Sequence, residues 1–232
     1  MKKLSDFYES RLASTELIKR VSSLIFVEVD DGVYDILGDV NFDELGLNSL
    51  LEVMTLLKEF AALEVSIRIG RVQGSFRCSF NYLTDLKGAP EIVERDFVCY
   101  HNRLETLEGA PKYVGGHFVC VRNKLKDLTG APQYVGGDFD CSHNQLVSLI
   151  GAPRRIGRHF DCSFNQLQTL QGAPEYVGGM FICHLNKLIS LEGAPKYIGE
   201  AFIYGDNPRK FTEEEVRKLI NVGGKVYVQE VD

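Results

Sequence analysis

The sequence predicts an α+β solenoid, a curved array of stacked units with a parallel β-sheet on its concave face. A 21-residue period carries this prediction, because Phe, Cys, Asn and two leucines recur at fixed positions of the unit. The alternation in Phe-x-Cys is typical of a strand with two inward side chains. Six Gly-Ala-Pro segments predict an extended, non-helical convex side, since Pro fixes its own φ and disfavours helix at the preceding residue.

The 232 residues divide into three predicted parts. Residues 72–207 form the solenoid, with about seven units of 21 residues. Repeat arrays require capped ends, so residues 1–71 and 208–232 are predicted to be helical caps that also contain strands.

Local patterns specify both predicted caps. Amphipathic helices are expected within residues 4–24 and 48–63, and FVEVDDGVYDIL resembles a hairpin around Asp31-Gly32. Near the C-terminus, Thr212 and Glu215 predict a capping box for a helix in EEEVRKLI, followed by a last strand in KVYVQEV.

All cysteines occupy one slot of the repeat, which Tyr204 takes in the final unit. Neighbouring strands would place them about 4.8 Å apart with parallel Cβ vectors, beyond the Cβ separation of about 3.8 Å typical of a disulfide. They are therefore predicted to be reduced core residues. This slot contains Cys78, Cys99, Cys120, Cys141, Cys162 and Cys183.

The recurring Asn and Gly residues are also given structural roles. Each Asn is predicted to satisfy backbone groups of its own and the adjacent turn, which makes an internal ladder. Gly pairs such as Gly115-Gly116 are expected to adopt positive φ where the chain turns into the strand. A phosphate-binding loop is not predicted, since neither a lysine nor a helix start follows them.

The unit x-Phe-x-Cys-x-x-Asn-x-Leu-x-x-Leu matches the frame L-x-x-L-x-L-x-x-N-x-L. Over residues 72–207 the chain therefore resembles the leucine-rich repeat family. Its fuller form, GGxFxCxxNxLxxLxGAPxxV, resembles uncharacterised leucine-rich repeat proteins of bacteriophages and bacteria. The resemblance implies a protein-binding module. One role it implies is a phage-encoded inhibitor of a host defence protein, located in the host cytoplasm.

The charge and the apolar content of the sequence limit the classes of partner that it predicts. The net charge of −6 and the pI near 5.5 argue against a nucleic-acid binder, although Arg103, Lys124, Lys126, Arg154, Arg155 and Arg158 could form a modest basic edge. The same charge is too dilute for a DNA mimic. A membrane span is not predicted, since there is no apolar run of 18 residues. The N-terminal MKKLSDFYES lacks the apolar run of a signal peptide, so a cytoplasmic location is expected.

Three outward columns of the Phe-x-Cys strands form the candidate site for a protein partner, for which a host protein is one candidate. They combine valines, isoleucines, Tyr and Met with an acidic centre, and apolar groups gathered on one face are typical of interfaces. The candidate partner-binding residues are Asp96, Val98, Tyr100, His117, Val119, Val121, Asp138, Asp140, His159, Asp161, Met180, Ile182 and His184.

The sequence leaves two alternatives open. His117, Asp138 and His159 share one column and could hold a divalent metal or support acid–base chemistry, although a hydrogen-bonded polar patch is favoured. The repeats also resemble those of bacterial effector ubiquitin ligases, which implies an adaptor recruiting a partner to a separate enzyme. No cysteine lies outside the repeat grid to serve as such an enzyme's nucleophile. The main prediction is a non-enzymatic protein with no cofactor.

Overall fold

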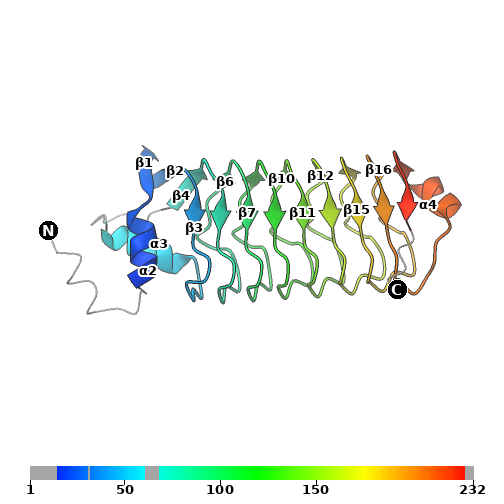
Figure 1. The fold of residues 1–232 in the computed structure, drawn as a ribbon, viewed down its shortest axis with the longest axis horizontal. Coiled ribbons are helices and arrows are strands. Elements are labelled where there is room, and N and C mark those ends of the chain that lie inside the picture. Colours follow the sequence, from blue (N-terminus) through cyan, green and yellow to red (C-terminus); the bar gives the residue numbers. More distant parts are fainter. Residues whose placement is uncertain (1–14, 31, 61–67, 228–232) are drawn as a thin grey trace.

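The repeats form a β-solenoid in which each turn contributes one short strand to each of two parallel sheets (Figure 1). The computed structural model describes residues 15–30, 32–60 and 68–227. About seven turns stack along a nearly straight axis in Figure 1, without the predicted curvature. The outer side of the first sheet therefore takes the place of the predicted concave face.

The first sheet, called here the phenylalanine sheet, contains the predicted Phe-x-Cys strands. Its strands pair in register, so that Phe97 lies beside Phe118 and Phe118 beside Phe139. In spatial order it comprises β19 (Val226–Tyr227), β17 (Phe202–Ile203), β15 (Phe181–Ile182), β13 (Phe160–Asp161), β11 (Phe139–Asp140), β9 (Phe118–Val119), β7 (Phe97–Val98), β5 (Phe76–Arg77) and β3 (Val40–Asn41).

The second sheet, called here the tyrosine sheet, forms where only an extended return was predicted. Its repeat strands follow each Gly-Ala-Pro and turn a Val or Ile inward. The non-helical return is thus confirmed, and its pairing into a sheet was missed. In spatial order it comprises β1 (Ile25–Asp30), β2 (Val33–Leu37), β4 (Arg68–Val72), β6 (Ile92–Val93), β8 (Tyr113–Val114), β10 (Tyr134–Val135), β12 (Arg155–Ile156), β14 (Tyr176–Val177), β16 (Tyr197–Ile198) and β18 (Asn221–Val222).

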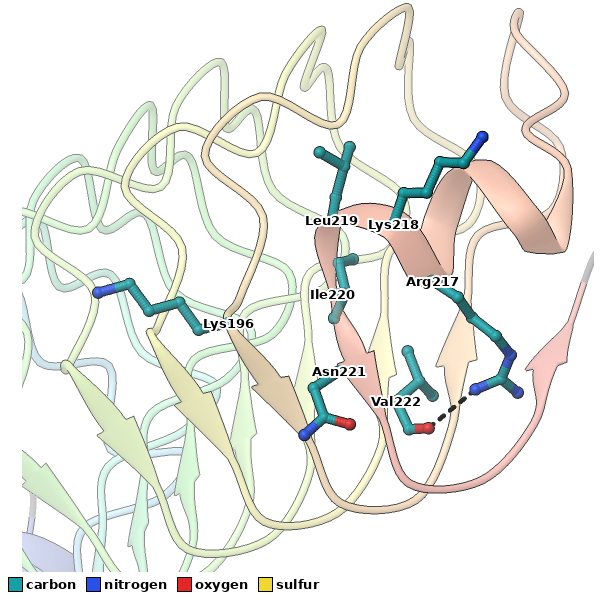
Figure 2. A pocket seen from close by; sticks show the side chains of 7 residues that line it. All are labelled: Lys196, Arg217, Lys218, Leu219, Ile220, Asn221 and Val222. Carbon is teal, nitrogen blue, oxygen red and sulfur yellow. Dashed lines mark hydrogen bonds between the residues drawn. The ribbon is translucent and has the colours of Figure 1, made fainter.

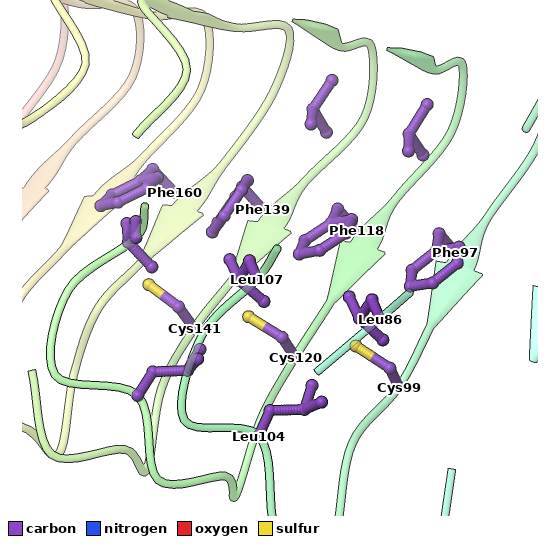
Figure 3. Close-up of a cluster of buried hydrophobic side chains, with 14 of the residues drawn as sticks. Leu86, Phe97, Cys99, Leu104, Leu107, Phe118, Cys120, Phe139, Cys141 and Phe160 are labelled. Atoms are coloured by element: carbon purple, nitrogen blue, oxygen red, sulfur yellow. The ribbon is translucent and has the colours of Figure 1, made fainter. Parts of the chain in front are cut away.

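Identical side chains fill the core between the sheets in columns (Figure 3). The rings of Phe97 and Phe118 stack with centroids 5.4 Å apart, and those of Phe118 and Phe139 with centroids 5.0 Å apart. The cysteines are buried and unbridged, as predicted. Burial raises the pKa of thiols such as Cys99 and Cys141 well above the ordinary value, so these sulfur atoms are inert, neutral packing groups.

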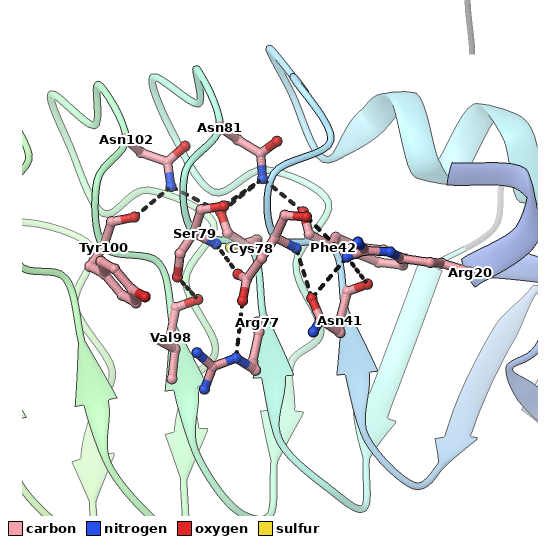
Figure 4. A network of polar contacts seen from close by, with 11 residues as sticks. Arg20, Asn41, Phe42, Arg77, Cys78, Ser79, Asn81, Val98, Tyr100 and Asn102 are labelled. Atoms are coloured by element: carbon pink, nitrogen blue, oxygen red, sulfur yellow. Dashed lines mark hydrogen bonds and ion pairs between the residues drawn. The ribbon is translucent and has the colours of Figure 1, made fainter. Parts of the chain in front are cut away.

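The predicted asparagine ladder is present and joins successive turns (Figure 4). The Asn102 amide nitrogen donates to the carbonyls of Cys99, 3.2 Å away in its own turn, and of Cys78, 2.9 Å away in the preceding turn. Its Oδ1 accepts from the backbone N–H of Leu83 at 3.1 Å. The same pattern recurs at Asn123. Each side chain thus satisfies buried backbone groups that no strand ladder reaches.

The Gly pairs do not adopt the positive φ that was predicted for them. Gly115 and Gly136 are not among the residues with positive φ; the Gly of each Gly-Ala-Pro is, as at Gly109 with φ 89°. A Cβ on Gly136 would instead collide with the carbonyl oxygen of Gly115 in the preceding turn. Glycine is needed there because the backbones of neighbouring turns approach closely.

Helices lie at both ends of the solenoid in Figure 1: α2 (Thr15–Ser22), α3 (Leu51–Phe60) and α4 (Glu213–Leu219). The predicted antiparallel hairpin is confirmed by β1 and β2. The capping box at α4 is also confirmed, since Thr212 and Glu215 bond reciprocally. The predicted helical residues 4–14 and 61–63 lie outside the described residues. The division into three domains stays a prediction, and both sheets continue across residue 71.

The phenylalanine column can be tested by cavity formation. Phe118→Ala is expected to lower the free energy of unfolding by about 3–5 kcal/mol, because the buried ring touches rings on both sides. Urea denaturation followed by circular dichroism measures this loss. Tyr113→Ala, at an exposed aromatic residue of the same turn, is the control and should cost less than about 1 kcal/mol. Equal losses in the two variants would contradict the stacked core.

Candidate binding surface

The in-register pairing of the phenylalanine sheet brings the candidate site residues together in three outward columns. The column before each Phe contains Asp96, His117, Asp138, His159 and Met180. The column between Phe and Cys, called here the middle column, contains Val98, Val119, Asp140, Asp161 and Ile182. The column after Cys contains Tyr100, Val121 and His184. Most of these side chains are half-buried, and Val98 is only 7% exposed.

The first column is a hydrogen-bonded ladder, as the favoured interpretation of its His and Asp residues predicted. Asp96 Oδ1 accepts from the backbone N–H of His117 at 2.9 Å, and His117 Nδ1 accepts from that of Asp138 at 3.0 Å. Asp138 Oδ1 then accepts from His159 N–H at 3.0 Å, and His159 Nδ1 from Met180 N–H at 2.9 Å. Each side chain therefore accepts a hydrogen bond from the backbone N–H of the residue that precedes the next strand.

This ladder uses the Nδ1 atoms of His117 and His159, one of the two nitrogens in each ring that could bind a metal. His117 Nδ1 also lies 3.0 Å from Asp138 Oδ2. Across the described ranges, no group of three or more His, Cys, Asp or Glu side chains could hold a metal ion. The imidazoles of His117 and His159 are best explained as backbone acceptors.

The middle column places two carboxylates side by side. Asp140 on β11 lies opposite Asp161 on β13, and both are half-buried. Burial, followed by the nearby Asp161 charge, raises the pKa of Asp140 above its ordinary value. Asp140 Oδ1 accepts from the backbone N–H of Ser142 at 3.0 Å. Asp161 Oδ1 accepts from the backbone N–H of Ser163 at 2.8 Å and from its hydroxyl at 2.6 Å. Within the described ranges, neither carboxylate forms an ion pair with Lys or Arg.

Apolar side chains continue the middle column on both sides of the carboxylates. Val98 and Val119 precede the pair along the solenoid, and Ile182 and Ile203 follow it. None of these four is fully exposed. The face is therefore a narrow apolar stripe interrupted by two acidic groups, which is less exposed than the sequence suggested.

A neighbouring column, two positions after each Cys, was not predicted as part of the surface. Its residues include Phe80, His101, His143 and Phe164, all with φ between 52° and 54°, a conformation unusual for bulky side chains. Phe80 stacks on His101 with centroids 4.8 Å apart, and His143 on Phe164 with centroids 4.0 Å apart. The signal that could have found this column is its aromatic and imidazole content at the 21-residue period.

The basic edge suggested by the sequence does not gather into one patch. Arg154 pairs with Glu175 at 2.9 Å, and Arg155 lies over the ring of Tyr176 on the tyrosine sheet, 4.2 Å from its centroid. Arg103 lies instead over the ring of Tyr82, 4.6 Å from its centroid. The basic groups are thus divided among different contacts.

An open cleft lies beside α4, at the C-terminal end (Figure 2). Its lining includes Lys196, Arg217 and Lys218, which could suggest an anion site. Each cation already has a partner: Lys196 pairs with Glu175 at 3.0 Å, and Arg217 and Lys218 pair with glutamates one helical turn earlier. The cleft is therefore a weaker candidate than the phenylalanine sheet.

Comparison of the sequence with protein-family models and with curated proteins finds no match. Any function proposed for this chain therefore rests on its own residues. Among the described helices, none has the length and apolar character needed to cross a membrane.

The side-chain ladder before the Phe column predicts a specific substitution pattern. His117→Ala removes the acceptor of the Asp138 N–H and is expected to cost about 1 kcal/mol of unfolding free energy. His117→Asn supplies a neutral Oδ1 acceptor and should recover most of that loss. Chemical denaturation at pH 7 makes the comparison. If Ala and Asn are equally destabilising, or if Ala costs nothing, the imidazole does not have this role.

Proposed function

We propose that this protein is a non-enzymatic polypeptide-binding module and that its site is the outer side of the phenylalanine sheet. The pair of Asp140 and Asp161 is set within an apolar column and has no Lys or Arg partner among the described residues, and this is the observation that supports the proposal most strongly. Two adjacent half-buried carboxylates repel each other, and a cation brought by a partner would relieve that repulsion. The module is therefore suited to a Lys or Arg side chain.

The surroundings of the carboxylates favour a polypeptide over a free cation. Val119 and Ile182 flank the acidic pair and would bury aliphatic neighbours of the partner's basic residue. Excluding water from the site would strengthen the charge-assisted hydrogen bonds. We thus infer a ligand segment with one basic residue between apolar residues.

The leucine-rich repeat relationship belongs to the same proposal. The spacing of Phe, Cys, Asn and Leu supports it, whereas a two-residue strand stands where that family has a helix or 3₁₀ turn. A host protein as the partner, a phage origin and a cytoplasmic location are further parts of the proposal that rest on the sequence resemblance.

A random peptide library displayed on yeast can test binding while the natural partner is unidentified. Selection on the purified protein is expected to enrich peptides with Arg or Lys between aliphatic residues. Val119→Glu combined with Asp161→Arg should abolish their binding and lower the free energy of unfolding by no more than about 2 kcal/mol, since both half-buried side chains lie on the outer side of the sheet and only the Ser163 bonds to Asp161 are lost. Failure to enrich any peptide class, or unchanged binding by this variant, would contradict the proposed site.

Neutralising the carboxylates separates function from stability. Asp140→Asn with Asp161→Asn should weaken binding of a selected basic peptide by about tenfold or more, which calorimetry measures. Because the pKa of Asp140 is raised in the folded state, its charge opposes folding at pH 7. Asp140→Asn alone should therefore raise the free energy of unfolding, while retaining an acceptor for Ser142 N–H.

The matched control is Asp85→Asn with Asp127→Asn. Each of these carboxylates also accepts a backbone N–H two residues later, but both lie in loops outside the proposed site. This control should bind the peptide as the unmodified protein does. If it loses affinity equally, the peptide responds to total charge, and the proposal for Asp140 and Asp161 fails.

A further inference from the structure

The two sheets end in four edge strands, and three of these are short. β3, β18 and β19 are each two residues long as described. Arg20 from α2 covers β3 and donates to the backbone carbonyls of Asn41 at 3.2 Å and Asp43 at 2.9 Å (Figure 4). Arg217 from α4 donates to the carbonyl of Val222 in β18 at 2.9 Å (Figure 2). Short strands and covered edges limit pairing with other chains.

The fourth edge strand, β1, is longer, and within the described ranges no helix side chain hydrogen-bonds to the backbone of its residues 25–29. It spans the six residues Ile25–Asp30 and pairs with β2 along one side only. In the described part of the chain, the backbone of residues 25–29 makes no hydrogen bond beyond its pairing with β2. An unpaired row of N–H and C=O groups of this length is a template for another strand.

The side chains of β1 fit the same interpretation. Phe26 lies opposite the buried Ile36, so this side of the strand faces the core. Ile25, Val27 and Val29 are 60%, 42% and 54% exposed, and the strand contains neither Pro nor Lys. Three exposed β-branched residues favour a further strand, while the carboxylates of Glu28 and Asp30 alternate with Val27 and Val29 along β1.

We infer that β1 pairs antiparallel with β1 of a second copy of this chain, forming a two-fold symmetric dimer. Residues opposite each other in antiparallel strands lie on the same face, so the two-fold axis must pass beside one residue. With Val27 at the axis, Val27 faces its own copy and Ile25 faces Val29. With Glu28 at the axis, two glutamates would oppose each other, which is unfavourable.

The Val27-centred register uses all three exposed aliphatic residues. A register centred on Phe26 would instead place Val29 opposite Ser23. An irregularity between Glu28 and Asp30 leaves Val29 without a register partner in β2, so the regular ladder ends at Glu28 and Val29 forms the edge of the proposed contact. The dimer would join the tyrosine sheets of the two copies into one and leave both phenylalanine sheets free.

Sedimentation equilibrium over a range of protein concentrations tests the dimer. The unmodified chain is expected to pass from monomer to dimer as concentration rises, and Val27→Lys to stay monomeric throughout. Val147→Lys is the matched control, since Val147 is 60% exposed in a loop, and it should dimerise normally. A monomer at every concentration, species larger than a dimer, or equal dimerisation of Val27→Lys would overturn the inference.

Disulfide formation tests the register independently of stability. Val27→Cys should link to its own copy under mild oxidation, while Val147→Cys should not. The native thiols are buried with raised pKa values, so they should not compete. A mixture of Ile25→Cys and Val29→Cys should link only as the mixed pair. Failure of Val27→Cys to link, or linkage of the control to the same extent, would overturn this register.

The dimer does not depend on the proposed peptide site. Val27→Lys should bind a selected basic peptide with unchanged intrinsic affinity, whereas the Asp140 and Asp161 variants should dimerise normally. Each proposal can therefore fail without the other.

Discussion

The asparagine side-chain amide is the interaction on which the solenoid depends. Each turn leaves the phenylalanine sheet through a sharp corner, where one residue takes a left-handed conformation and several backbone groups turn inward. The amide of the next residue, such as Asn144, donates to carbonyls of its own and the preceding turn, and its oxygen accepts from the backbone of that preceding turn. Only a side chain with a short stem and both hydrogen-bonding functions fits this place. The turn between β3 and β5 is longer than 21 residues, and Asn81 still donates to the carbonyl of Phe42 and accepts from the backbone N–H of Leu47.

The same geometry separates structural from variable positions. Side chains that point inward meet their equivalents about 4.8 Å away, so Phe, Cys and Leu repeat in columns. The outward positions are less constrained, but they are not all free. The His and Asp residues of the column before the Phe positions form a second ladder on the surface, so their residue types have a structural explanation. The residue types of the middle column have no such explanation. The paired carboxylates of Asp140 and Asp161 lie there.

Much of the fold was predictable because the same residues recur at the same positions of successive repeat units. The strand face, the asparagine ladder, the reduced cysteines and the capping box at Thr212 all follow from local chemistry at fixed spacing. The tyrosine sheet was missed because its two-residue strands are too short to show alternation, and only pairing between turns defines them. Straightness was equally hidden, because it follows from pairing in the second sheet, which spaces the turns on that side as the phenylalanine sheet does on the other.

The candidate site was less predictable than the fold. Sequence position placed Asp140 and Asp161 in one column, but whether their charge is compensated depends on partners distant in sequence. His117 looked like a candidate metal ligand because its bond to the backbone N–H of Asp138 has no signature in one repeat. The open edge at β1 was hidden as well, because it depends on which strands the terminal helices cover.

The free energy of unfolding of Asn144→Asp at pH 7 tests the dependence on the amide most directly. The substitution keeps the shape and removes the donor, so a carboxylate would face the carbonyl oxygens of Cys120, Cys141 and Ser142. We expect a loss of at least about 3 kcal/mol, because several buried groups lose their partner at once. Gln145→Glu, at the exposed next residue, should stay within about 0.5 kcal/mol. If Asn144→Asp were as stable as the unmodified protein, the amide ladder would not be what holds the turns together.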